Sequence, residues 1–187
     1  TIRVCQKDFM DALNAGQITV ESAAGLSYQY TGDQIKVPND KITLKETSAL
    51  SGADLSAAVK SAYTEDAGNP SKGLTEQKVE VYLDATKLPN FSNVPKSILA
   101  SKNTVTVKKR DLASDCVISL GEIWGTTVIP LDKIPTGTYV YDLSDYLVFK
   151  DKEGNLLNLN DGFDYTVTVK KNGVQVTNAL ESVGTYE

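Results

Sequence analysis

The chain has 187 residues, of which 41% are hydrophobic, 23% charged and 7% aromatic. That length allows one or two small domains and excludes a large multidomain enzyme. The formal net charge is -5, so the chain lacks the cationic surplus that binding to nucleic acid requires. Histidine is absent, which excludes Ser-His and Cys-His catalytic pairs and histidine zinc sites. We therefore expect a structural or adhesive role, with no enzyme activity and no cofactor.

Two nine-residue stretches, about 100 residues apart, resemble each other. Residues 1–9 (Thr-Ile-Arg-Val-Cys-Gln-Lys-Asp-Phe) align with residues 104–112 (Thr-Val-Thr-Val-Lys-Lys-Arg-Asp-Leu). Each combines an alternating strand pattern with a basic residue, an aspartate and a large apolar residue. This repeat predicts two tandem modules, residues 1–103 and 104–187, each about the size of a β-sandwich domain.

Apolar runs between Gly, Pro, Asn and Asp residues predict strands throughout both modules. These runs are Gln17–Val20, Ile35–Val37, Lys41–Leu44, Gln77–Leu83, Thr104–Val107, Cys116–Leu120, Thr126–Ile129, Tyr139–Tyr141, Tyr146–Phe149, Asp164–Lys170 and Gly173–Val176. Asn172 and Gly173 connect the last two runs and predict a tight type I′ hairpin, because both residue types tolerate positive φ.

One alanine-rich stretch departs from the strand pattern. It brings three apolar residues to one face at helical spacing and offers two capping residues: Leu55, Val59, Ala62, Ser51 and Asp54. We expect a short helix near 51–63, followed by an exposed loop over 64–73.

Two runs resemble the immunoglobulin-like repeats of bacterial surface proteins. Leu26–Val37 contains a Tyr-Thr-Gly turn before an apolar strand, and Asp161–Val169 contains Gly-Phe-Asp-Tyr-Thr-Val. Gly184-Thr185-Tyr186 is similar to the motif that closes such repeats. The resemblance implies an all-β chain of two tandem immunoglobulin-like β-sandwich domains, the first with a short helical insertion. It also implies a non-catalytic spacer or protein-binding repeat of a bacterial cell-surface or secreted protein.

The second module ends soon after the closing motif, and we expect it to lack its final strand. Residues beyond this sequence or a neighbouring molecule would then supply that strand. The expected partners are neighbouring repeats of the same polypeptide and a host or cell-surface protein or glycan. No apolar run approaches the roughly 20 residues of a membrane span, so we expect no membrane insertion in this segment.

Four aromatic residues suggest an alternative function as a carbohydrate-binding module of a secreted polysaccharide-processing protein. They are Trp124, Tyr139, Tyr141 and Tyr146. Aromatic rings stack on sugars, but Tyr139 and Tyr141 share one strand face, and packing in the core is the favoured explanation for such residues.

Oxygen-bearing side chains gather at Asp151, Glu153 and Asn155, where they could bind a hard cation such as calcium. Turns select the same residue types on backbone grounds, so a plain turn is the favoured interpretation. Nearby carboxylates, among them Asp142 and Asp145, have no spacing that indicates a glycosidase pair.

The two cysteines, Cys5 and Cys116, are too few and too far apart for a disulfide scaffold. Cys116 lies in an apolar run, where burial raises the pKa of a thiol, and we expect Cys5 to face solvent. A lysine crosslink would need an apolar-buried lysine, for which three strand residues are candidates: Lys36, Lys78 and Lys150.

Overall fold

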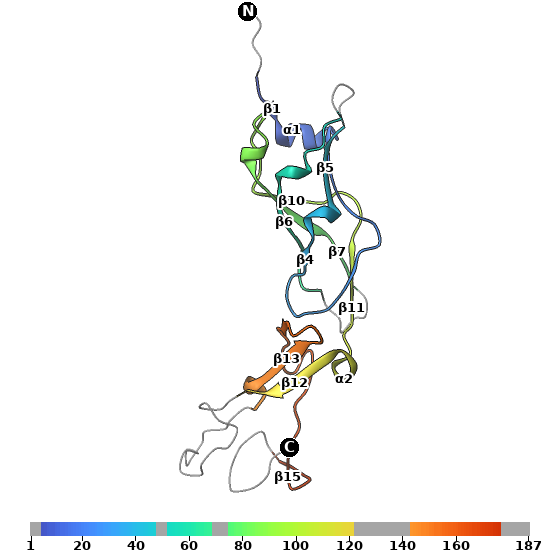
Figure 1. Cartoon of the computed structure of the whole chain (residues 1–187), viewed down its shortest axis with the longest axis vertical. Coiled ribbons are helices and arrows are strands. Elements are labelled where there is room, and N and C mark those ends of the chain that lie inside the picture. Colours follow the sequence, from blue (N-terminus) through green and yellow to red (C-terminus); the bar gives the residue numbers. More distant parts are fainter. Residues whose placement is uncertain (1–4, 48–51, 69–74, 122–142, 177–187) are drawn as a thin grey trace, which may run out of the picture. The chain divides into compact units, whose positions relative to one another are not determined.

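The computed structural model describes residues 5–47, 52–68, 75–121 and 143–176 (Figure 1). It divides into two compact units, Thr1–Lys109 and Arg110–Glu187. Strands arranged in several small sheets are the main regular structure, and no described helix reaches seven residues. The predicted β-rich character is therefore confirmed. Within the described ranges, no helix has the length and apolar character needed to span a membrane.

The described residues of the first unit form one α-helix and most of the strands. α1 spans Phe9–Asn14, and 3₁₀ turns span Asn39–Lys41, Ser56–Ala58 and Ala85–Lys87. The strands are β1 (Lys7–Asp8), β2 (Ile18–Ser22), β3 (Ser27–Gln29), β4 (Lys36–Val37), β5 (Ile42–Glu46), β6 (Val59–Thr64), β7 (Thr75–Gln77), β8 (Val79–Leu83), β9 (Phe91–Ser92), β10 (Ser97–Leu99) and β11 (Val105–Lys108).

These strands form four small sheets. The largest has the order β10-β8-β6-β4 and is antiparallel throughout. β2 pairs antiparallel with β5, and β1 pairs parallel with β9. In the fourth sheet, β11 lies between β3, to which it is parallel, and β7, to which it is antiparallel.

The helix α1 begins at Phe9, directly after the aspartate of the repeated stretch, where the sequence predicted no helix. Asp8 has extended backbone angles, and its Oδ1 accepts a hydrogen bond from the Asp11 amide at 3.0 Å, which caps the helix. Phe9 and Ala12 then point into the core and are buried. The aspartate in the repeated motif is thus a helix N-cap.

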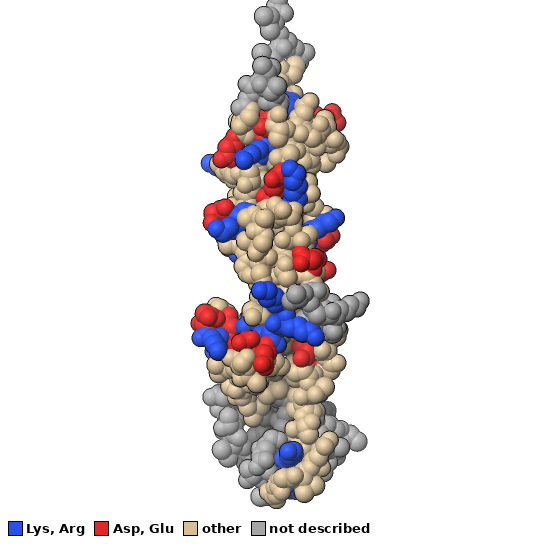
Figure 2. Space-filling view, turned by 90° about the vertical axis from the view of Figure 1, so that its right-hand side faces the viewer, with Lys and Arg blue, Asp and Glu red and all other residues tan. Residues whose placement is uncertain are grey.

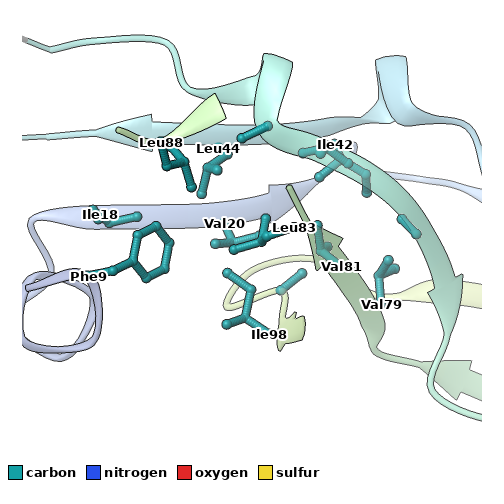
Figure 3. Packing of buried hydrophobic residues seen from close by; sticks show 14 of the residues in the cluster. Phe9, Ile18, Val20, Ile42, Leu44, Val79, Val81, Leu83, Leu88 and Ile98 are labelled. Carbon is teal, nitrogen blue, oxygen red and sulfur yellow. The ribbon is translucent and has the colours of Figure 1, made fainter. Parts of the chain in front are cut away.

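The core of the first unit draws side chains from α1, the β2–β5 pair and the four-stranded sheet (Figure 3). β2 and β8 both alternate buried and half-buried residues, so each strand turns one face toward this core. Phe9 meets Phe91 edge-on, with ring centroids 5.6 Å apart. Burial of each large apolar side chain contributes about 1.5–3 kcal/mol to the stability of the fold, and these contributions hold the short strands together.

The predicted helix near 51–63 is wrong. A 3₁₀ turn covers only Ser56–Ala58, and the rest of the apolar stretch is β6 (Val59–Thr64), which pairs with both β4 and β8. The alanines favoured a helix, but Val59, Tyr63 and Thr64 are strand formers, and pairing on both edges outweighs local propensity.

The strand at Val105–Lys108 belongs to the first unit, whereas the sequence repeat had placed it at the start of the second. Val105 and Val107 are fully buried, and β11 pairs with β3 and β7 of that unit. The division between compact units falls between Lys109 and Arg110. Only Lys109 and Arg110 separate β11 from Asp111, the cap of the next helix.

The second unit contains α2 (Leu112–Asp115), a 3₁₀ turn at Leu143–Tyr146, and five described strands. They are β12 (Cys116–Leu120), β13 (Leu147–Asp151), β14 (Leu156–Leu157), β15 (Val169–Lys171) and β16 (Val174–Val176). β12, β13 and β14 form an antiparallel sheet in that order, and β15 pairs with β16. Phe149, Leu157 and Val169 are buried, and the Phe149 and Tyr165 rings lie 4.6 Å apart.

The predicted hairpin at Asn172-Gly173 is confirmed. Both residues have positive φ, 50° and 81°, and Lys171 pairs with Val174 across the turn. The strand predicted over Asp164–Lys170 is mostly wrong, since Gly162–Asp164 form a turn and β15 begins at Val169. The runs Thr126–Ile129 and Tyr139–Tyr141 lie outside the described residues.

Candidate functional site

Three of the four aromatic residues proposed for sugar binding, Trp124, Tyr139 and Tyr141, lie outside the described residues. Tyr146 ends the 3₁₀ turn before β13 and is half-buried. Its carbonyl accepts a hydrogen bond of 2.6 Å from the Gly121 amide. Tyr146 therefore has a backbone role in the β12–β13 pair, and the aromatic row stays a prediction.

The proposed cation ligands lie at the turn between β13 and β14. Asp151 is 8% exposed, and its two carboxylate oxygens accept hydrogen bonds from the backbone amide (2.7 Å) and side-chain amide (2.9 Å) of Asn155. The side-chain bond from Asn155 is the main cause that lowers the pKa of Asp151, and burial opposes it. Glu153 is exposed. The structure joins Asp151 and Asn155 as a turn, and the described residues contain no cluster of three or more His, Cys, Asp or Glu side chains placed to hold a metal.

The two cysteines are free thiols. Cys5 is exposed, as predicted, while Cys116 is half-buried at the start of β12. Burial raises the pKa of the Cys116 thiol, and the nearby charge of Arg110 opposes that rise. The raised pKa agrees with the effect expected of burial in an apolar run.

The three lysines considered for a crosslink, Lys36, Lys78 and Lys150, are all exposed. These three residues therefore lack the apolar burial that the crosslink requires.

The outer face of the four-stranded sheet carries a group of side chains that sequence analysis missed. The Tyr63 and Tyr82 rings meet edge-on at 6.1 Å. The Glu80 carboxylate accepts hydrogen bonds from the Tyr82 hydroxyl at 3.1 Å and the Ser97 hydroxyl at 2.7 Å. We call Tyr63, Glu80, Tyr82 and Ser97 the tyrosine face. Strand alternation within Val79–Leu83 could have indicated that Glu80 and Tyr82 share a face, but Tyr63 lay in the stretch read as a helix.

A second feature joins the beginning and the end of the first unit. Residues 101–103, just before β11, run parallel along the edge of β2 that faces away from β5. The Ser101 amide donates to the Val20 carbonyl at 2.8 Å, and the Ser22 amide donates to the Lys102 carbonyl at 3.4 Å. We call this contact between Val20–Ser22 and Ser101–Asn103 the terminal clasp.

Side chains reinforce the terminal clasp. Asn103 Nδ2 donates to the Ser22 carbonyl at 2.6 Å, and Ser22 Oγ donates to the Asn103 carbonyl at 3.3 Å. Lys102 Nζ lies 2.8 Å from Glu21 Oε1. Ser22 is 80 residues or more from its partners in the sequence, so no local pattern could have predicted these bonds.

The two units begin with the same arrangement. Asp8 caps α1, and Asp111 caps α2 by accepting from the Ala113 amide at 3.0 Å. In each unit the next strand, β2 or β12, pairs antiparallel with a strand that ends in an acid, so that Ile18 faces Glu46 and Cys116 faces Asp151.

The basic residue before each cap interacts with that acid. Lys7 Nζ lies 2.9 Å from Glu46 Oε1. The charge of Arg110 contributes to the lowered pKa of Asp151. The similarity first seen in nine residues of sequence therefore extends to the pairing partner of the following strand.

On the face shown in Figure 2, acidic and basic side chains are interspersed over the first unit. A surface of mixed charge favours solubility, whereas polyanions bind to surfaces where basic side chains predominate.

A scan of protein families and searches of curated proteins and solved structures found no match to the chain.

Proposed function

We propose that the chain is a non-catalytic structural or adhesive module of a bacterial cell-surface or secreted protein, where it acts as a spacer or protein-binding repeat. In this proposal the two units are tandem immunoglobulin-like β-sandwich domains that lie outside the cell. The repeated beginning, with a basic residue, a capping aspartate, a short helix and an antiparallel strand pair, supports a chain built from similar units.

The terminal clasp is the observation that supports a mechanical role for the first unit. β2 lies near the start of the first unit, and Ser101–Asn103 lie near its end, yet the two segments run parallel and are hydrogen-bonded. A pull on the two ends slides parallel neighbours past each other, so their hydrogen bonds must break together. Antiparallel neighbours pulled from one end would instead open one bond at a time.

Single-molecule force spectroscopy on the full chain tests this function. We expect two separate unfolding events, because each compact unit should resist force by itself. Fully extended, Thr1–Lys109 spans about 39 nm and Arg110–Glu187 about 28 nm, before the folded lengths are subtracted. A single event of about 67 nm, or extension without a resisting event, would contradict the proposal.

The variant Asn103→Ala should lower the unfolding force of the larger event only, because it removes the 2.6 Å bond to the Ser22 carbonyl. The matched control is Asn155→Ala, which removes a side-chain bond from a turn of the second unit that is not part of the clasp. The control should leave the larger event unchanged.

The tyrosine face supports the second candidate, carbohydrate binding. Tyr63 and Tyr82 are half-buried, and Ser97 and the Glu80 carboxylate lie beside them as polar groups that could meet sugar hydroxyls. Titration of a glycan panel would test this candidate by NMR shifts at the tyrosine face and by fluorescence of Trp124. A saturable response lost in Tyr82→Ala or in Trp124→Ala would favour it and would show which surface binds, whereas no response across the panel would favour the spacer or protein-binding repeat.

A further inference from the structure

The strand β12 lies at the edge of its sheet in the described part of the second unit. The Gly121 amide donates to the Tyr146 carbonyl, so Gly121, Ser119 and, by alternation, Val117 bond to β13. The amides and carbonyls of the residues between them, Ile118 and Leu120, point toward the other edge. Of the strands that the structure describes, β13 alone pairs with β12.

The same edge of the equivalent strand β2 is covered in the first unit. At the two ends of the β2–β5 pair, the Gln17 carbonyl accepts from the Thr47 amide and the Ala23 amide donates to the Lys41 carbonyl. The alternate residues Val20 and Ser22 bond instead to Ser101 and Lys102. That covering segment runs parallel to β2. Ala100 just before this segment and Val105 just after it belong to the same buried core as Ile18 and Val20 of β2.

Within the described residues, the apolar side chains of β12 are exposed where those of β2 are buried. Ile18 and Val20 of β2 are at most 1% exposed, whereas Ile118 and Leu120 of β12 are 49% and 43% exposed. Soluble chains rarely leave an apolar edge strand open without charged or proline residues to block pairing, and residues 116–120 contain neither.

We infer that the edge of β12 with which no described strand pairs (the free edge) binds an extended peptide segment that runs parallel to it and carries apolar residues at alternate positions, as residues 100–105 do along β2. Backbone hydrogen bonds to Ile118 and Leu120 would hold the segment, and its apolar side chains would cover the same two residues. The inference deepens the proposed function, on which it rests, by naming the chemistry of the partner that a protein-binding repeat of this kind would take.

The probe that tests this site is a fluorescent peptide with the sequence of residues 97–108, since this segment already shows the required fit to β2. Its anisotropy is measured during titration with the full chain. We expect saturable binding to the wild type. Binding that does not saturate at any accessible concentration would overturn the inference.

The informative variant is Ile118→Pro, which removes an amide that faces the free edge and leaves the amides that bond to β13 in place. Loss of one backbone bond should weaken binding about tenfold or more. Ile118→Thr keeps the amide, removes apolar contact and should weaken binding less. The matched control is Leu156→Thr on β14, the opposite edge strand, where the side chain is also strongly exposed. Equal affinity for the proline variant and the wild type would overturn the inference.

Hydrogen exchange in the free full chain provides a measurement independent of the variants. We expect slow exchange at Ser119 and Gly121 and fast exchange at Ile118 and Leu120, with protection of the latter two when the peptide binds. Protection of Ile118 and Leu120 in the free monomer would show that the chain covers this edge itself and would overturn the inference. Protection that grows with chain concentration, without peptide binding, would assign the edge to self-association instead. Neither result alters the force experiment on the terminal clasp, so the two proposals fail separately.

Discussion

The first strand pairs of the two units follow the same local plan but differ in burial. Each follows an aspartate-capped helix, and each pairs antiparallel with a strand that ends in an acid. β2 alternates buried and half-buried residues, whereas every residue of β12 after Cys116 is exposed. The contrast teaches that the same local plan can lead to different burial: the side chains of β2 join a core built from α1 and the four-stranded sheet, whereas no described element buries those of β12.

The largest expected effect is on the free energy of unfolding when the first helix residue of each unit is replaced by alanine. Phe9 is fully buried against Phe91, so Phe9→Ala should lower the free energy of unfolding of the first unit by about 3–5 kcal/mol. Leu112, which follows the second cap, is half-buried, and Leu112→Ala should cost about 1 kcal/mol. Denaturant unfolding followed by NMR signals of each unit measures both values.

Equal costs at Phe9 and Leu112 would contradict the comparison, because they would mean that the two helices are buried alike. Phe163→Ala serves as a control for loss of a ring at an exposed site, where the expected change is within about 0.5 kcal/mol.

The next largest effect concerns the contribution of Asn103, in the terminal clasp, to stability. Asn103 has a φ of 62° and donates to the Ser22 carbonyl, so Asn103→Ala loses a bond and also forces an alanine into the left-handed region. We expect a loss of about 2–3 kcal/mol from the two contributions together. Asn103→Gly relieves the backbone and loses only the bond, for which about 1 kcal/mol is expected. Thermal unfolding of both variants would separate the two causes, and identical losses would show that the backbone angle is unimportant.

Most strands could be predicted from the sequence because their alternation follows directly from burial of one face. The runs that became β2, β5 and β8 are examples, and the Asn172-Gly173 turn required only local chemistry. The helix predicted near 51–63 was wrong because an alanine-rich stretch fits a helix or a strand. Pairing of β6 with β4 and β8 made this stretch a strand.

The candidate surfaces were harder to predict than the strands. The tyrosine face depends on the register between β6 and β8, and the terminal clasp joins residues about 80 positions apart. Neither arrangement leaves a signal in a window of ten or fifteen residues. The aspartate repeat was visible in the sequence, but its meaning as a helix cap needed the backbone angles of Asp8 and Asp111.

A smaller, pH-dependent effect concerns the second unit. The pKa of Asp151 lies below its ordinary value of 3.8, chiefly because of the bond from Asn155. Its contribution to stability is therefore present above pH 3.8 and is lost as the pH falls through the lowered pKa of the folded state. Asn155→Ala should bring that pKa back toward 3.8 and flatten the dependence of unfolding on pH. Titration of the Asp151 carboxyl by NMR checks the direction, and an unchanged pKa in the variant would contradict it.

The smallest expected effect comes from the ion pair of the terminal clasp. Glu21 and Lys102 lie 2.8 Å apart, but their side chains are 31% and 65% exposed, so water and salt screen the attraction. Glu21→Gln should cost at most about 0.5 kcal/mol at low ionic strength and nothing measurable in molar salt. Urea unfolding of wild type and variant at two salt concentrations measures this difference. A cost above 1 kcal/mol that persists in high salt would mean that the pair, and not the backbone and Asn103 bonds, holds the two ends of the first unit together.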